Sequence, residues 1–421
     1  MVLLKTIKKR DNSIVEFDLD KITKAIRKAG KETDEFGYKA SEILAHEVLN
    51  ELIKSDNNDL SVEDVQDTVE MVLLNSEYKA TAKAYIIYRE KRNQERKPNL
   101  FKSRVNLKPY EYPQLNEYKE AVQHSYWLHT EFSYTSDVQD YKVNINNKER
   151  NAIKNAMLAI SQVEVAVKNF WGDLHNRIPK PEVGAVGAVF SESEVRHSDA
   201  YSHLLEILGL NGEFEKIQDI PALANRVNSL TQAIKYTKSE SNKDFALSLI
   251  LFSLFIEHVS LFSQFLVIMS FNKHKNIFKG ISNAIEATSK EEQLHGLFGI
   301  ELVNIIRNEN PEWFDDEMTK KVYDACKTTF ESELDVIDWI YEDGDLDFLP
   351  KEVTKEFIKN RLNNSLKSVG FEPIFEIDES LIEQTEWFTD EILVTKHVDF
   401  FVKRSVNYTK KTQSFDADSL F

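Results

Sequence analysis

Cysteine, proline, glycine and net positive charge are all scarce in this sequence of 421 residues. Its single cysteine, Cys326, excludes an internal disulfide bond and a cysteine-rich zinc site, and it fits a reducing compartment. With only 12 glycines and 9 prolines the chain has too few turn residues for an all-β protein, so we predict a mainly helical fold. The formal net charge of −17 argues against nucleic-acid binding, which needs a basic surface.

An export signal is also missing from the start, because no apolar region precedes the first lysines and no small-residue cleavage site follows. One apolar run, Phe245 to Phe271, is long enough to cross a bilayer. Glu257 and His258 lie in its middle, and a carboxylate without a partner is costly in lipid. We therefore expect a buried bundle helix in a cytoplasmic protein without membrane contact, in which Glu257 has a partner.

The chain divides into four parts. Residues 1–97 have the pattern of a small α+β domain, with an alternating hairpin segment followed by amphipathic helices. Prolines among mixed charges predict an extended linker at 98–118. A large helical domain is expected at 119–395, and a polar, acidic tail with apolar residues at its tip at 396–421.

Glutamate and histidine recur at helical spacing in the large domain. Glu194 and His197 are three residues apart, as are Glu292 and His295, so each pair shares one helix face. One Glu-x-x-His is weak evidence in a glutamate-rich chain, and Ser191 with Glu194 also fits a helix cap.

Two further glutamates, Glu164 and Glu257, lie amid apolar residues on two other expected helices. A lone glutamate on each of two helices and a Glu-x-x-His on each of two others is the inward-facing ligand set of a ferritin-like bundle with two metal ions. Four carboxylates and two imidazoles suit iron or manganese. A metal ion would also be the partner that a buried Glu257 needs.

Residues 1–95 resemble the ATP-cone, a nucleotide-sensing domain. The resemblance rests on IKKRD at 7–11, VEFDLDKI at 15–22 and AYIIYR at 84–89. It implies that ATP and dATP bind here as allosteric effectors, with Lys9 and Arg10 on the phosphates and Lys21 and Arg89 as further contacts. A basic run on a solvated strand is the alternative interpretation.

Residues 118–421 are similar to the radical-generating small subunit of class I ribonucleotide reductase. Beside the six glutamates and histidines, the resemblance is carried by Tyr201, seven residues after Glu194, by Trp127 in YWLHTEF, and by Tyr408 in KRSVNY. It implies that a reduced metal pair reacts with an oxygen species and then either oxidises Tyr201 or stores the missing electron itself.

The same resemblance implies a route for the oxidising equivalent to a separate large subunit, where ribonucleotides become deoxyribonucleotides. This route runs through His197, Glu291, Trp127 and Tyr408. The acidic tail is then the peptide that docks on the large subunit, and the working small subunit is a homodimer.

Lys168 follows the first glutamate of the ligand set by one turn, where a lysine is most often a solvated cation. A Lys168 that points inward is instead similar to the manganese-using members of the family. We therefore expect two manganese ions, with two iron ions or a mixed manganese–iron pair as alternatives. Whether Tyr201 carries a radical stays open. Leu261 and Phe265, one and two turns after Glu257, are expected to keep the centre dry.

ATP-cones usually belong to the large subunit. Their presence here implies that this chain senses the ATP to dATP ratio itself, and that dATP converts the homodimer into a higher oligomer, a tetramer. Two other functions stay open: a stand-alone ferritin-like di-metal oxidase with a regulatory nucleotide domain, and a ferritin-like storage or purely regulatory protein.

Overall fold

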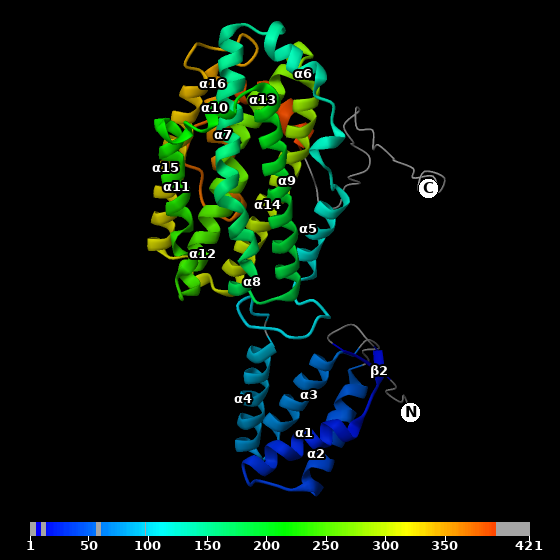
Figure 1. Cartoon of the computed structure of the whole chain (residues 1–421). Coiled ribbons are helices and arrows are strands. Elements are labelled where there is room, and N and C mark those ends of the chain that lie inside the picture. Colours follow the sequence, from blue (N-terminus) through cyan, green and yellow to red (C-terminus); the bar gives the residue numbers. More distant parts are fainter. Residues whose placement is uncertain (1–5, 10–13, 56–59, 97, 393–421) are drawn as a thin grey trace, which may run out of the picture. The chain divides into compact units, whose positions relative to one another are not determined.

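The computed structural model describes residues 6–9, 14–55, 60–96 and 98–392; the side chains of residues 93–96, 164–168, 218, 232 and 233 are outside the description. Two compact units are present, Met1–Pro98 and Asn99–Phe421. Helices dominate both (Figure 1). The predicted fold class, mainly helical with a small α+β part at the N-terminus, is confirmed.

The first unit packs four helices beside a two-stranded antiparallel sheet in which Ile7 is opposite Val15. Its core includes Ile26, Val48 and Leu73, which are fully or almost fully buried. Its elements are β1 (Thr6–Lys8), β2 (Ile14–Glu16), α1 (Leu19–Glu32), α2 (Tyr38–Lys54), α3 (Val62–Asn75) and α4 (Lys79–Arg96).

Long helices form the body of the second unit. In Figure 1, α7, α9, α13 and α14 run side by side, and α14 also packs against the π-helical segment η5. These elements are α5 (Pro113–His124), α7 (Asn147–Gly172), α9 (Pro181–Leu208), α11 (Pro221–Ile234), α12 (Asn242–Leu251), η5 (Phe252–Ser260), α13 (Phe262–Lys275), α14 (Lys279–Glu309), α15 (Asp316–Ile340) and α16 (Lys351–Ser368).

Short helical elements connect and cover the long ones. They are η1 (His129–Glu131), α6 (Thr135–Gln139), η2 (Asp140–Asn144), α8 (Leu174–Arg177), α10 (Asn211–Phe214), η3 (Ile217–Asp219), η4 (Lys235–Lys238), η6 (Pro311–Trp313), α17 (Glu379–Ile382), η7 (Glu383–Thr385) and α18 (Glu386–Ile392).

The segment expected as an extended linker, 98–118, belongs structurally to the second unit from Asn99 onward. Leu100 and Leu115 are completely buried in its core, and α5 begins at Pro113, where a fixed φ and a missing N–H suit the first helical position. The prolines therefore mark the approach to a helix and not a free linker.

The apolar run is the buried centre of the bundle. Within the described residues, one helical stretch, Asn242–Lys275, is long and apolar enough to span a membrane, and its most apolar window is 100% buried. The interpretation of this run as a core helix is confirmed. It is divided into α12, η5 and α13, and the π-helical part carries Glu257.

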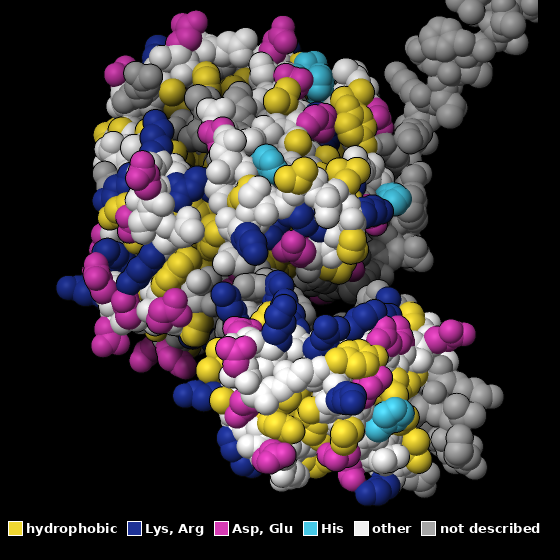
Figure 2. Space-filling view, turned by 90° about the horizontal axis from the view of Figure 1, so that it is seen from below, with side chains coloured by type: hydrophobic (Ala, Val, Ile, Leu, Met, Phe, Trp, Pro, Cys, Tyr) yellow, Lys and Arg dark blue, Asp and Glu magenta, His cyan; other side chains and the backbone are white. Residues whose placement is uncertain are grey.

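Charged side chains of both signs are exposed on the face drawn in Figure 2. In the view of Figure 2, lysine and arginine are interspersed with aspartate and glutamate on each unit. This mixture is typical of a solvated surface.

Candidate metal centre

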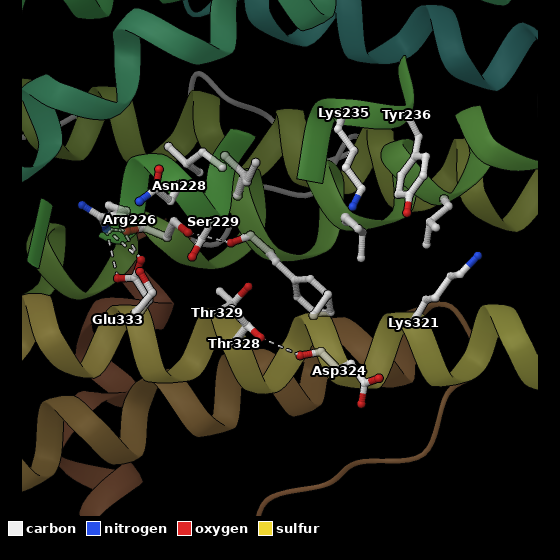
Figure 3. Close-up of a pocket in the computed structure, with 18 residues that line it drawn as sticks. Arg226, Asn228, Ser229, Lys235, Tyr236, Lys321, Asp324, Thr328, Thr329 and Glu333 are labelled. Atoms are coloured by element: carbon white, nitrogen blue, oxygen red, sulfur yellow. Dashed lines mark hydrogen bonds and ion pairs between the residues drawn. The ribbon is translucent and has the colours of Figure 1, made fainter. Parts of the chain in front are cut away.

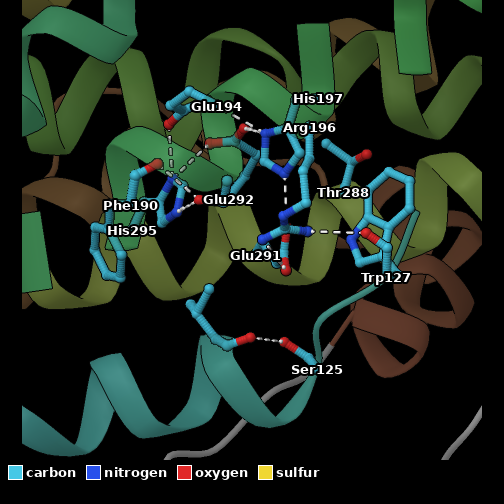
Figure 4. A network of polar contacts seen from close by, with 12 residues as sticks. Ser125, Trp127, Phe190, Glu194, Arg196, His197, Thr288, Glu291, Glu292 and His295 are labelled. Atoms are coloured by element: carbon cyan, nitrogen blue, oxygen red, sulfur yellow. Dashed lines mark hydrogen bonds and ion pairs between the residues drawn. The ribbon is translucent and has the colours of Figure 1, made fainter. Parts of the chain in front are cut away.

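Three elements of the second unit bring five of the six predicted ligands together. Glu194 and His197 lie on α9, Glu257 on η5, and Glu292 and His295 on α14, and all five are at most 2% exposed. The spacing of three residues within α9 and within α14 places each pair on the face that points into the bundle (Figure 4).

One ligand atom from each of four of these residues lies within 4.8 Å of the others; the four are Glu194, Glu257, Glu292 and His295. The sixth predicted ligand, Glu164, lies on α7, which packs against α9 and α13. Its side chain and that of Lys168 are outside the described residues.

Glu194 and Glu292 each reach both imidazoles. One oxygen of Glu194 is 3.0 Å from Nδ1 of His295 and the other is 3.3 Å from Nδ1 of His197. One oxygen of Glu292 is 2.9 Å from Nδ1 of His197 and the other is 3.3 Å from Nδ1 of His295. Two carboxylates that each present one oxygen to each of two histidines are arranged as bridges between two positions.

Glu257 is associated with the His295 side of the cluster. Its Oε2 atom is 3.5 Å from Nδ1 of His295 and has no hydrogen-bond partner among the described residues. Its Oε1 atom accepts a hydrogen bond of 3.1 Å from Nε1 of Trp171. A buried carboxylate oxygen without a donor fits a cation, because burial of a charge requires a partner.

The outer nitrogen of each histidine also has a partner. Nε2 of His197 lies 2.8 Å from a carboxylate oxygen of Glu291, and Nε2 of His295 lies 3.0 Å from the hydroxyl of Ser193. These contacts hold both rings with Nδ1 toward the carboxylates, the orientation that a metal-binding histidine needs.

Electrostatics at the cluster favour positive charge. Burial by itself lowers the pKa of His197 and His295, but the hydrogen bonds and charges of the surrounding carboxylates outweigh it and raise the pKa of each ring well above its usual value. Burial and the neighbouring Glu292 raise the pKa of Glu257 well above that of a free carboxyl. The raised pKa values mean that the cluster holds protons tightly when no metal is bound. Divalent cations would supply the same positive charge, so the residues fit a metal centre.

Part of the predicted transfer route also comes together. The rings of Trp127 and His197 stack with centroids 6.1 Å apart and planes 20° apart. Arg196 donates hydrogen bonds of 3.1 and 3.2 Å to Glu291, and it also donates to the backbone oxygen of Trp127 at 3.4 Å (Figure 4). The indole and the imidazole are thus linked both by stacking and through the Arg196–Glu291 ion pair.

Four further residues were predicted at the centre or on the transfer route. Tyr201 is buried on α9, two turns after Glu194. Leu261 and Phe265 are buried beyond η5. Tyr408 lies outside the described residues.

Four residues near the ligands were not predicted from the sequence. Trp171, Ser193 and Arg196 contact the site as described above, and the ring of Phe190 lies 4.1 Å from that of His295 between centroids. Ser193 and Arg196 are sequence neighbours of the ligands on α9. Trp171 follows Glu164 by seven residues, which is two turns on the same helix face, so this spacing could have indicated it.

The predicted nucleotide contacts lie in the first unit. Lys9 is exposed directly after β1, Lys21 is exposed on α1, and Arg10 is outside the described residues. Arg89 is bound to three carboxylates at distances of 2.6 to 3.0 Å, those of Glu63, Asp67 and Glu70. These ion pairs would compete with a phosphate for its guanidinium.

Arg89 also borders a cavity of about 160 Å³ between α1, α3 and α4. Lys28, Tyr88 and Arg92 line the same cavity. It therefore combines cations with an aromatic ring, a combination that suits a phosphorylated aromatic molecule.

Residues 104–381 match the family model for the ribonucleotide reductase small chain. The chain belongs to this family. Residues 5–94 of the small chain match the ATP-cone domain. The predicted resemblance, the ferritin-like fold and the ATP-cone are thereby confirmed, and the chain is a subunit of an oxidoreductase.

Named relatives match both parts of the small chain. Ribonucleoside-diphosphate reductase subunit beta of Chlamydia pneumoniae is 24% identical over 310 residues, which cover 69% of this chain and 88% of that protein. Vitamin B12-dependent ribonucleoside-diphosphate reductase of Thermoplasma acidophilum is 41% identical over 95 residues, 21% of this chain and 12% of that protein.

Solved structures share the fold. Dimanganese(II) NrdF of Streptococcus sanguinis has a TM-score of 0.59 at 17% identity and covers 67% of this chain and 97% of its own. The Rnr4 homodimer of Saccharomyces cerevisiae has a TM-score of 0.55 at 16% identity, with coverage of 72% and 96%. An R2-like ligand-binding oxidase with a Mn/Fe cofactor has a TM-score of 0.54 at 17% identity, with coverage of 62% and 94%.

Proposed function

We propose that this small chain holds two metal ions among Glu164, Glu194, His197, Glu257, Glu292 and His295, and that it supplies the oxidising equivalent for ribonucleotide reduction. The observation that carries the proposal is that Glu194 and Glu292 each present one oxygen to each of two Nδ1 atoms. These residues would hold a metal pair, which would supply the oxidising equivalent.

Two manganese ions are the proposed occupants, with two iron ions or a mixed pair as alternatives. The donor set of carboxylates and imidazoles suits either metal. Lys168 on α7, one turn after Glu164, supports manganese through the resemblance to manganese-using members, and a dimanganese neighbour shares the fold.

Metal analysis combined with electron paramagnetic resonance of the activated protein tests this proposal. A tyrosyl signal would assign the stored equivalent to Tyr201, and a coupled multi-line manganese spectrum would assign it to the metals. A protein that takes up neither manganese nor iron would rule out the metal centre.

The bound metal pair supplies the oxidising equivalent, and residues of the small chain conduct it. An electron enters from the large subunit through Tyr408 and passes by way of Trp127 toward His197. The stacking of Trp127 on His197 gives a short contact for this transfer. Glu291 accepts the proton of His197 Nε2 in a hydrogen bond, and two hydrogen bonds from Arg196 orient the Glu291 carboxylate. Leu261 and Phe265 help to exclude water from the oxidant.

The partners of the small chain are a second copy of itself and a ribonucleotide reductase large subunit. The shared fold with a homodimeric neighbour supports the first. Family membership supports the second, with residues 396–421 as the docking tail. The proposed location of this assembly is the cytoplasm.

The ATP-cone is proposed to regulate the small chain by oligomerisation, with ATP and dATP as effectors and Lys9, Arg10 and Lys21 as contacts for the nucleotide. Arg89 is a fourth proposed contact and the weakest one, because three carboxylates already bind it. Binding of dATP would make the ATP-cones of two dimers associate. In the resulting tetramer the C-terminal tails could not reach the large subunit.

Removal of residues 1–97 tests the regulatory role. With a large subunit that lacks its own cone, the shortened chain should keep its activity, lose inhibition by dATP and stay dimeric in light scattering. Inhibition by dATP that persists in this pair would contradict the role of the cone.

A stand-alone di-metal oxidase is the second candidate, because an R2-like ligand-binding oxidase shares the fold. Such an oxidase needs neither Tyr408 nor the tail. Removal of residues 396–421 should abolish ribonucleotide reduction and leave metal uptake unchanged. Full turnover without the tail would favour the oxidase.

A further inference from the structure

The glutamate at position 257 is carried by a nine-residue π-helical segment, Phe252–Ser260, inside an otherwise α-helical run. π-Helical geometry is rare and costs stability relative to a continuous α-helix. Where a π segment returns to α, the hydrogen-bond spacing changes and one carbonyl oxygen near the junction is skipped, so a side-chain donor can stabilise the last turn. The position of Glu257 depends on what stabilises this turn.

Two buried arginines from different helices bind carbonyl oxygens of this last turn. Nε of Arg361, on α16, donates a hydrogen bond of 2.8 Å to the carbonyl oxygen of His258. Nη2 of Arg226, on α11, donates a hydrogen bond to the carbonyl oxygen of Ser260. The two arginines are 7% and 1% exposed, so water does not replace these bonds.

Arg361 also ties the π segment to the helix that carries two other ligands. Its Nη2 donates a hydrogen bond of 3.0 Å to Gln293, the residue between Glu292 and Leu294 on α14. The amide of Gln293 in turn lies 3.4 Å from Nε2 of His258. One guanidinium thus contacts the backbone next to Glu257 and a side chain next to Glu292.

The surroundings of Arg361 indicate that its hydrogen bonds, and not only its packing, contribute to the structure. Within the described residues no carboxylate forms an ion pair with it; its guanidinium lies instead 3.6 Å from the ring centroid of Phe262. Burial lowers its pKa to about 9. An apolar side chain would avoid the desolvation of this cation, so the contribution of the arginine lies in its two hydrogen bonds.

Arg226 connects the π segment to three more helices. It forms a buried ion pair with Glu333 of α15 at 3.0 Å, and it donates to the carbonyl oxygen of Ala159 on α7 at 3.2 Å and to Gln264 of α13 at 2.8 Å. Figure 3 shows Arg226 and Glu333 facing each other at one end of a cavity of about 410 Å³, whose wall includes Ser260.

We propose that Arg226 and Arg361 are positioning residues that clamp the π segment and thereby hold the Glu257 carboxylate in place for the metal ions. This inference rests on the proposed metal centre. The two arginines touch neither metal ligands nor substrate; they act through the backbone at 258 and 260. Loss of either clamp lets the segment relax toward a regular α-helix, which rotates Glu257 away from His295.

Equilibrium binding of Mn(II) to the full-length apo protein tests the clamp. Arg361→Lys and Arg226→Lys keep a cation and most of the buried stem, but one ammonium group cannot reproduce the planar set of donors. We expect the second Mn(II) to bind at least tenfold more weakly in each variant, with loss of the spin-coupled dimanganese signal in electron paramagnetic resonance. Arg361→Met should show a larger loss.

Arg307→Met is the matched control. Arg307 also donates to a carbonyl oxygen, that of Val369, and also lies over phenylalanine rings, those of Phe314 and Phe371, which are outside η5. This variant should bind both Mn(II) ions like the wild type. Amide hydrogen exchange of residues 252–260 in the apo protein should be at least tenfold faster in the Arg361 and Arg226 variants than in the control.

The possible results separate the clamp from the metal centre. Wild-type affinity, an unchanged dimanganese spectrum and unchanged exchange in both lysine variants would overturn the clamp alone. A wild-type protein that binds no Mn(II) and no Fe(II) would overturn the metal centre and the clamp with it. If Arg361→Met fails to fold, the lysine variants and the exchange data decide.

Discussion

His197 and Glu291 are joined by a buried hydrogen bond of 2.8 Å between the Nε2 atom of the ring and a carboxylate oxygen. Glu291 directly precedes the predicted ligand Glu292 on α14, so one helix supplies both a carboxylate of the cluster and the partner of a histidine on α9. The bond fixes which nitrogen faces the metal site.

We predict that Glu291→Gln and Glu291→Ala weaken metal binding by about 10- to 100-fold, the usual loss when the partner of a metal-binding histidine is removed. Calorimetric titration of the apo protein with Mn(II) measures this. Glu286→Gln is the control, because Glu286 is a buried glutamate of the same helix whose partner is Lys290. Equal affinity of wild type and Glu291→Ala would contradict the positioning role of Glu291.

Trp171→Phe should destabilise the apo protein without disrupting the core. The variant keeps an aromatic ring but removes the Nε1 donor that binds Glu257. Loss of a hydrogen bond to a buried carboxylate should lower the free energy of unfolding of the apo protein by about 1–3 kcal/mol. Chemical denaturation measures the change, and Trp339→Phe, which removes another indole away from the ligands, should have a smaller effect.

Glu182→Ala should be among the most destabilising single changes in the second unit. The Glu182 carboxylate is completely buried, pairs with Arg104 and accepts backbone hydrogen bonds of 2.9 and 3.2 Å from residues 111 and 112. Removing it leaves Arg104 without its buried partner, at a cost of about 3–5 kcal/mol.

Asp347→Ala provides the comparison for that change. Asp347 is 93% exposed and pairs with Lys148 at 3.0 Å. Its removal should cost no more than about 1 kcal/mol, because solvent screens exposed ion pairs. Similar losses for the two variants in denaturant titrations would show that the Glu182 network does not stabilise the fold.

Cys326 should be unreactive in the folded protein. Burial raises the pKa of its thiol to about 12, so almost no thiolate is present at pH 8. Ellman's reagent should find no reactive thiol in the native protein and one in denaturant. Because the chain has a single cysteine, a rapid reaction of the native protein would show that the region around α15 opens readily.

The cap of α3 makes the stability of the first unit depend on pH. The hydroxyl and backbone N–H of Ser61 donate to Asp64 and lower the pKa of its carboxyl below its usual value. This contribution is present above the unfolded-state pKa of about 3.9 and is lost as the pH falls through the lower folded-state pKa.

Hydrogen exchange of α3 between pH 7 and pH 3 measures this effect. Ser61→Ala should weaken protection by about 1 kcal/mol at pH 7, and the difference from wild type should shrink in acid. A difference that stays constant with pH would show that the Asp64 charge does not contribute.

Local spacing predicted which residues lie at the proposed metal centre, but it did not predict how they are arranged. The Glu-x-x-His pairs and the lone Glu257 in an apolar run identified five residues that do converge, because helical periodicity alone decides which side chains share a face. The apolar run from Phe245 to Phe271 was predicted as a core helix because a carboxylate lies in its middle.

Longer-range packing could not be predicted in the same way. The prolines at 98–118 indicate extended chain locally, yet burial of Leu100 and Leu115 against the second unit decides where that segment belongs. Nothing in the sequence near Glu257 indicates that Trp171 binds it or that its helix turn is π-helical. These features depend on contacts between residues far apart in the chain.

By itself the sequence determined the helical fold, the small N-terminal domain ahead of a large helical one, and the glutamate and histidine set, since composition, period and spacing can be read along the chain. Only the tertiary structure decided that Glu194 and Glu292 each span both histidines, that Arg196 links Glu291 to Trp127, and that two distant arginines bind the turn after Glu257. The physical reason is that a buried charge or carbonyl oxygen takes whichever partner packing brings within hydrogen-bond distance.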